Sequence, residues 1–161
     1  MSIKDSMMDE AGEPRVPITH MLQRLIADEW LSYYQYWTAY NMSRGEGKFD
    51  VDPEFEEHAK EEREHADMLM DRLNQLGGIP PQDPGDWEKM SHGFQYIDCC
   101  KVPRILDITI EAEQTAIAAY KELIAATHGV DAVTCKLGVD ILKEEEEHLY
   151  DLMRLRESIT P

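Results

Sequence analysis

The sequence predicts an all-α protein, a four-helix bundle with one long crossover between the second and third helices. Two observations predict this fold. Four stretches of the 161-residue chain repeat their apolar residues at helical spacing. Between the second and third stretches, residues 79–101 contain Pro80-Pro81 and Pro84-Gly85 and show no sustained period. A connection of this length is explained if the third helix must begin at the far end of the bundle.

A single domain is expected from the length of the chain. Residues 1–17 lack periodicity and close with Pro14 and Pro17, so we expect a loose N-terminal tail there. The bundle then occupies residues 18–161, which is enough chain to bury a substantial core.

The first two helices are expected to form a pair. The first should run over residues 18–44, before a stop at Gly45, and it carries Glu29 on its apolar stripe. A charge on such a stripe is costly unless it is paired or bound to metal. The second should begin at Asp52-Pro53-Glu54, which supplies a cap and a first-turn proline, and end at Gly77-Gly78.

The last two helices are expected to form a similar pair. The third should run from Val102-Pro103 to about residue 126, and the fourth from about residue 131 to about residue 158. Gly138 lies inside the fourth, where glycine costs about 1 kcal/mol relative to alanine. In the crossover, Trp87, Phe94 and Tyr96 could pack against the side of the bundle or a neighbouring subunit.

A repeated motif of acidic residues and histidines gives the strongest functional signal. Each half of the chain contains one helical Glu, followed 32 or 33 residues later by Glu-x-x-His. In a helix the Glu and His of that motif project from one face. Two copies form the ligand set of carboxylate-bridged di-iron and di-manganese helix bundles. The predicted metal ligands and catalytic residues are Glu29, Glu62, His65, Glu113, Glu145 and His148.

Glu111 is the alternative to Glu113 as the ligand of the third helix. The two lie about 200° apart on a helix, so only one faces the core. Tyr36 follows Glu29 by seven residues and Tyr120 follows Glu113 by seven, so the internal repeat favours Glu113. Each tyrosine could hydrogen-bond a ligand carboxylate.

Other polar residues are expected to be solvated rather than to bind metal. In the run Glu144–Glu147, only Glu145 should face inward. The histidines outside the motif, His20, His58, His92 and His128, are expected in solvent.

Composition excludes several classes of protein. The 33 acidic and 16 basic residues give a net charge of −17, which repels nucleic acid and anionic membranes and concentrates cations. We therefore expect no DNA binding. The sequence has no long apolar run and no secretory signal, and its three cysteines form no disulfide framework, so a cytoplasmic location without membrane contact is expected.

At these motifs the sequence resembles the ferritin superfamily, and most closely the bacterioferritin-like branch that contains the Dps-like thioferritins. The resemblance covers residues 18–158. It implies a ferroxidase centre with two iron ions inside each subunit, where Fe(II) is oxidised by hydrogen peroxide or dioxygen. It also implies a hollow cage that stores ferric mineral and protects against oxidative stress. Without a fifth helix, a shell of 12 subunits is expected by analogy.

Two features of the related proteins, a haem ligand and a cysteine pair, bear on what this resemblance implies. Bacterioferritin ligates haem through a Met after the Glu of its first Glu-x-x-His, but here that place holds Arg63, so haem is not expected. Thioferritins place a cysteine pair near the iron site, for which Cys99, Cys100 and Cys135 are candidates here. The pairing and redox role of these cysteines remain open.

Alternative functions share the same ligands. Iron and manganese accept identical oxygen and nitrogen donors, so a discrete di-metal peroxidase or a manganese catalase-like oxidoreductase without storage is the first alternative. A non-enzymatic helical interaction protein is the second, and it would bind no stoichiometric metal.

Overall fold

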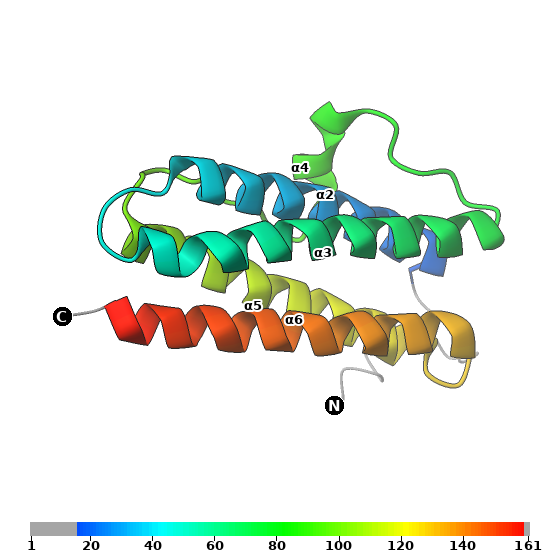
Figure 1. Ribbon diagram of the computed structural model, residues 1–161. Helices are drawn as coiled ribbons and strands as arrows, with labels where there is room; N and C mark the ends of the chain where they lie inside the picture. The colour runs from blue at the N-terminus through cyan, green and yellow to red at the C-terminus, as the bar shows by residue number, and fades with distance from the viewer. Residues whose placement is uncertain (1–15, 160–161) are drawn as a thin grey trace.

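The computed structural model describes residues 16–159, which form a bundle of four long helices (Figure 1). The long helices are α2 (Ile18–Met42), α3 (Lys48–Gln75), α5 (Val102–Thr127) and α6 (Ala132–Ile159). The crossover carries a 3-10 turn, η1 (Pro84–Asp86), and a short helix, α4 (Trp87–Met90). Within these residues there is no strand, only an isolated bridge between Arg44 and Lys101. The predicted all-α bundle is confirmed, and residues 1–15 of the expected tail lie outside the described part.

The four helices form two antiparallel hairpins that pack side by side. Helix α2 pairs with α3 and α5 pairs with α6, while α2 also contacts α5 and α3 contacts α6 (Figure 1). The crossover returns the chain along the bundle to the end where α2 finished, and there the Arg44 amide donates to the Cys100 carbonyl at 2.8 Å. This explains the length of the crossover, because α5 begins at the opposite end from the C-terminus of α3.

The apolar core is divided into two clusters. One contains Leu22, Leu69 and Leu123, and the other contains Phe55 and Leu106 with their neighbours. Along every long helix, the predicted ligands fall between the residues of one cluster and those of the other. The polar centre is therefore enclosed at both ends by packed side chains.

Helix α3 begins earlier than the sequence predicted. It starts at Lys48, after Gly47 in the left-handed region with φ of 79°, and Pro53 lies inside it. Asp52 is therefore not a cap. Its carboxylate accepts hydrogen bonds from Lys48 at 2.6 Å and from Ser43 at 3.0 Å. These contacts hold the α2–α3 turn. Pro53 lies near the start of the helix, where the loss of a backbone hydrogen bond at proline is tolerated.

The crossover is held against α2 by polar and aromatic contacts. The Trp87 ring stacks on Trp30 with centroids 5.7 Å apart, as expected for packing on the bundle side. Arg24 donates to the Met90 carbonyl at 2.9 Å, and Asp28 accepts hydrogen bonds from both the backbone and the ring of His92. His92 is thus partly buried and paired, which corrects the expectation that it is solvated.

Gly138 allows α5 and α6 to approach closely. A Cβ atom there would lie 3.1 Å from Ile124 Cγ1 and 3.3 Å from Leu123 Cδ2. Helix α6 continues through this position without interruption.

No helix in residues 16–159 is long and apolar enough to cross a bilayer. The free thiols of Cys99 and Cys100 lie just before α5, whereas the free thiol of Cys135 lies in the first turn of α6, at the other end of the bundle.

Candidate metal centre

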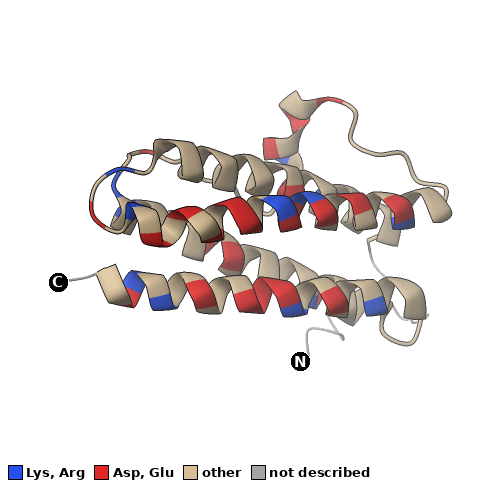
Figure 2. Cartoon of the chain, viewed as in Figure 1, with Lys and Arg blue, Asp and Glu red and all other residues tan. Residues whose placement is uncertain are grey.

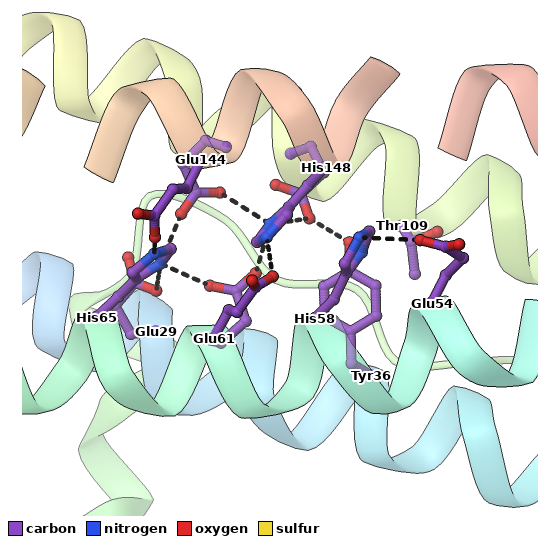
Figure 3. Close-up of polar contacts among 12 residues, drawn as sticks. Glu29, Tyr36, Glu54, His58, Glu61, His65, Thr109, Glu144 and His148 are labelled. Atoms are coloured by element: carbon purple, nitrogen blue, oxygen red, sulfur yellow. Dashed lines mark hydrogen bonds and ion pairs between the residues drawn. The ribbon is translucent and has the colours of Figure 1, made fainter. Parts of the chain in front are cut away.

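The six predicted ligands come together in the middle of the bundle. Figure 3 shows Glu29, His65 and His148 among them. Glu29 comes from α2, Glu113 from α5, and the two Glu-x-x-His motifs from α3 and α6. All six are at most 3% exposed. The helical spacing of each motif points its Glu and His to the same side, so the centre is built from all four helices.

The ligand atoms form two groups that share two carboxylates. One group is Glu29, Glu62, His65 and Glu145, and the other is Glu62, Glu113, Glu145 and His148. Within each group the candidate atoms lie within 4.8 Å of one another. Glu62 and Glu145 could therefore bridge two ions, each of which would also be held by one terminal carboxylate and one imidazole.

The structure places Glu113, and not Glu111, at this centre. Glu111 is exposed and accepts a hydrogen bond from Gln95 at 2.7 Å. The two residues project to opposite sides of α5, as expected from their spacing on a helix, and the inward residue is Glu113, as the internal repeat predicted.

The centre contains buried oxygen and nitrogen atoms that have no hydrogen-bond partner and could bind metal ions. Within the described residues, six buried atoms of these ligands have no hydrogen-bond partner. They are Glu29 Oε2, Glu113 Oε2, both carboxylate oxygens of Glu145, and Nδ1 of His65 and His148. Buried polar atoms are rarely left unpaired, because each costs about 1–3 kcal/mol. Oxygen and imidazole donors are the ligands that divalent iron and manganese accept, so the residues present fit two such ions.

Carboxylates of the opposite helix orient both imidazoles. His65 on α3 donates through Nε2 to Glu144 on α6 at 2.7 Å, and His148 on α6 donates through Nε2 to Glu61 on α3 at 2.8 Å (Figure 3). Each Nδ1 atom is then turned toward the four ligand carboxylates. Metal-binding histidines are commonly oriented in this way by a partner at the other ring nitrogen.

The role of Glu144 was missed in the sequence, where it was expected on the solvated face of α6. Its side chain is 44% exposed, yet it reaches His65. The signal was present, because a second Glu precedes the Glu of both motifs, at Glu61 and at Glu144.

Two tyrosines bind the terminal carboxylates from the partner hairpin. The Tyr36 hydroxyl on α2 donates to Glu113 on α5, and the Tyr120 hydroxyl on α5 donates to Glu29 on α2. This confirms the predicted hydrogen bonds. Burial and the nearby carboxylates raise the pKa of both tyrosines, which therefore remain donors.

Comparison with known proteins identifies the family. Residues 19–160 match the ferritin-like domain of the ferritin family.

The chain belongs to the ferritin family.

Three similar proteins are a thioferritin, a DNA protection during starvation protein and a Dps. The structure of the dodecameric thioferritin of Bacteroides fragilis, a bacterioferritin-related protein, is 34% identical with a TM-score of 0.86, over 98% of this chain and 91% of that one. The "DNA protection during starvation protein" of Pyrococcus furiosus is 28% identical over 144 residues, 88% of this chain and 78% of the relative. Dps from Thermosynechococcus elongatus shares the fold, with a TM-score of 0.80 at 22% identity over 85% of this chain and 88% of that one. The protein is thus a Dps-like member of the ferritin superfamily.

In this ferritin-like centre, burial changes the proton affinity of the ligands. Burial and repulsion from Glu62 raise the pKa of Glu29 and Glu145 well above 4.5. Burial opposes a charge on His65 and His148, but the surrounding carboxylates prevail and raise the pKa of both imidazoles. Burial also acts on Glu62, yet the nearby imidazoles of His65 and His148 lower its pKa. Without metal, the centre therefore holds protons that a bound cation must displace.

His58 is buried in this ferritin-like bundle, which corrects the expectation that it is solvated. It is 2% exposed, and its ring stacks on His148 with centroids 4.1 Å apart. Burial and the neighbouring His148 lower the pKa of His58 to about 4.

Proposed function

We propose that this protein is a ferroxidase that oxidises Fe(II) with hydrogen peroxide or dioxygen at a di-iron carboxylate centre. Copies of the chain assemble into a cage of 12 subunits that stores the ferric product as mineral and limits oxidative damage. The observation that carries the proposal is the pair of buried four-ligand groups that share Glu62 and Glu145. Two bridging carboxylates hold two Fe(II) ions side by side, as a two-electron oxidation requires.

The residues of the centre account for binding and proton transfer. Four carboxylates supply four negative charges, which balance two divalent ions. The two Fe(II) substrates give two electrons to one hydrogen peroxide, which takes up two protons and leaves as two water molecules. The protons that Glu29 and Glu145 hold in the metal-free centre are available for release when Fe(II) binds.

The similarity to the Bacteroides fragilis thioferritin supports the proposed cage. That protein is dodecameric, and this chain is 34% identical to it over nearly its whole length. The net charge of −17 also suits a shell that gathers cations.

A matched pair of variants tests the ferroxidase centre. We expect Glu113→Ala to slow peroxide-dependent Fe(II) oxidation by at least about tenfold, because it removes the terminal carboxylate of one metal position. Glu111→Ala changes an exposed glutamate on the same helix and should keep the wild-type rate. The measurement is stopped-flow absorbance of Fe(III) formation at two Fe(II) per chain. Equal rates in the two variants would refute the proposed centre, and turnover of peroxide without iron would favour a manganese catalase-like enzyme.

A further inference from the structure

A groove lies between the crossover and the face that α2 and α5 share. Its outer part has a volume of about 640 Å³ and is lined by residues 93–95 of the crossover and by part of α5. Its inner part, of about 20 Å³, reaches α2 at Asp28, Ser32 and Gln35. The two parts share the lining residues Gly93, Phe94, Ala112 and Thr115. The groove therefore leads from the surface to polar side chains of α2.

Small side chains of α5 leave this space open. The residues of α5 that line it include Ala112, Thr115, Ala116 and Ala118, where larger side chains would fill the groove. Phe94 of the crossover forms part of the other wall and is only partly buried. A stripe of small residues alone does not show what occupies the space.

Gln35 supplies the independent sign of a ligand. It is 2% exposed, and its Nε2 donates to the Gln95 carbonyl at 2.7 Å. Because a carbonyl can only accept, the amide of Gln35 must turn its nitrogen toward Gln95. Its Oε1 is buried without a hydrogen-bond partner, and the residue lines the inner part of the groove. Buried acceptors are rarely left without a donor, so the inner part has a place for an N–H or O–H group.

The charged residues that line the groove are acidic. Asp28 lies at the inner part, where its carboxylate accepts hydrogen bonds from the backbone and the ring of His92. Glu111 lies at the outer part and is exposed. Among residues 16–159, no lysine, arginine or histidine belongs to the lining of the groove. Its charge therefore complements a ligand with cationic donor groups.

One residue connects the two acceptor ends of the groove. Gln95 accepts a hydrogen bond from Gln35 through its carbonyl, and it donates through Nε2 to Glu111 at 2.7 Å. The amide of Gln35 and the carboxylate of Glu111 are therefore about the length of one side chain apart. A short chain of methylene groups spans such a distance.

We propose that this groove binds an aliphatic diamine, with one primary ammonium group in the inner part and the other beside Glu111. The inner part has room for a group of the size of one water molecule, which suits an ammonium group. There the ammonium donates to Gln35 Oε1 and to Asp28. The methylene chain lies on Ala112 and on the ring of Phe94, which also attracts the cationic ends. The site is separate from the metal centre and does not depend on the ferroxidase activity.

Binding in the groove must be distinguished from a general attraction of amines to the acidic surface. Ten residues of α3 and seven of α6 are acidic, against two in α2 and four in α5. Figure 2 shows acidic residues along α3 and α6, whereas α2 is almost free of them. An amine that only screens charge collects on α3 and α6, and neither helix contributes a described residue to the groove. Substitutions in α5 therefore separate the two kinds of binding.

Isothermal titration calorimetry of the full chain in its native assembly tests the proposal, with putrescine as the diamine and butylamine as a monoamine of equal chain length. At an ionic strength of about 0.15 M, we expect putrescine to saturate a single site per chain. Butylamine should bind at least about tenfold more weakly, because it lacks the second charged donor.

A matched pair of variants assigns the site to the groove. Glu111→Gln should weaken putrescine binding by about tenfold, because it removes the charge beside the outer ammonium. Glu122→Gln, at an exposed position of the same helix outside the groove, should bind as the wild type does. Ala112→Leu fills the groove and should abolish binding.

Three outcomes would overturn the inference, and none of them bears on the ferroxidase centre. Equal putrescine affinities in Glu111→Gln, Ala112→Leu and Glu122→Gln would show that the amine only screens the acidic surface. No saturable binding to the wild-type assembly would show that the groove is filled by water or covered by a neighbouring subunit. Equal affinities for butylamine and putrescine would reject a diamine as the ligand.

Discussion

Each imidazole of the centre depends on a carboxylate from the facing helix. Glu144 is half exposed, yet it receives the Nε2 proton of His65 and so keeps Nδ1 directed at the metal position. A neutral amide can accept that hydrogen bond but holds the ring less firmly and makes it a weaker ligand.

We predict that Glu144→Gln lowers the affinity of the centre for Fe(II) by about 10- to 100-fold. Glu146→Gln, a change at an exposed neighbour that pairs with Lys121, should have no such effect. Anaerobic titration with Co(II), followed by its visible absorption, measures both variants. Indistinguishable affinities for the two would show that Glu144 has no positioning role.

The protons of the metal-free centre predict how its stability depends on pH. His65, His148, Glu29 and Glu145 all have a raised pKa in the folded chain, so the folded state binds more protons than the unfolded state. The stability that these groups give to the folded state is complete below their ordinary pKa values, 4.5 for glutamate and 6.5 for histidine. It is lost as the pH rises above those values. The lowered pKa of Glu62 acts in the opposite direction, but only as pH falls below 4.5.

The melting temperature of chelator-treated protein should therefore fall as pH is raised from about 6.5 to about 9. Saturating Mn(II) should reduce or reverse this trend, because metal binding displaces the protons and strengthens with pH. Differential scanning calorimetry in the two conditions measures the effect. A melting temperature of the metal-free protein that rises over this range would contradict the assigned protonation.

At the scale of the helices, the α5–α6 contact depends on a residue without a side chain. At Gly138 a Cβ would meet Ile124 and Leu123 at 3.1 and 3.3 Å, closer than ordinary contact. We expect Gly138→Val to destabilise the bundle by about 1–3 kcal/mol by overpacking this contact. Lys136→Val, at an exposed position of the same helix, should cost less. Thermal unfolding of metal-free protein compares them, and equal losses would show that the close approach is unimportant.

The sequence predicted the helices well because each buries one continuous stripe. The stripe of α3, including Phe55 and Leu73, is buried as expected, and the repeat correctly favoured Glu113 over Glu111 as the residue that faces inward. The start of α3 was predicted wrongly, because Asp52 looks like a cap but binds Lys48 and Ser43. Local signals near Pro53 could not show that the turn would be held by these contacts.

The parts of the centre that the sequence missed depend on contacts between helices. The hydrogen bond of Glu144 and the burial of His58 depend on how α3 and α6 face each other. The apolar period of either helix does not specify this. The assignment of the six ligands as metal-binding residues stays a prediction, supported by their convergence and their unpaired atoms.

At the scale of the whole molecule, we propose that a buried di-iron centre works inside a storage shell built from copies of this acidic chain. The measurement that tests this most directly is the iron retained per chain after peroxide-driven Fe(II) loading and size-exclusion chromatography. We predict tens of iron atoms per chain, eluting with an assembly of about twelve subunits. If uptake stops at about two iron atoms per chain on a small oligomer, the centre is a discrete di-metal oxidoreductase and the storage function is contradicted.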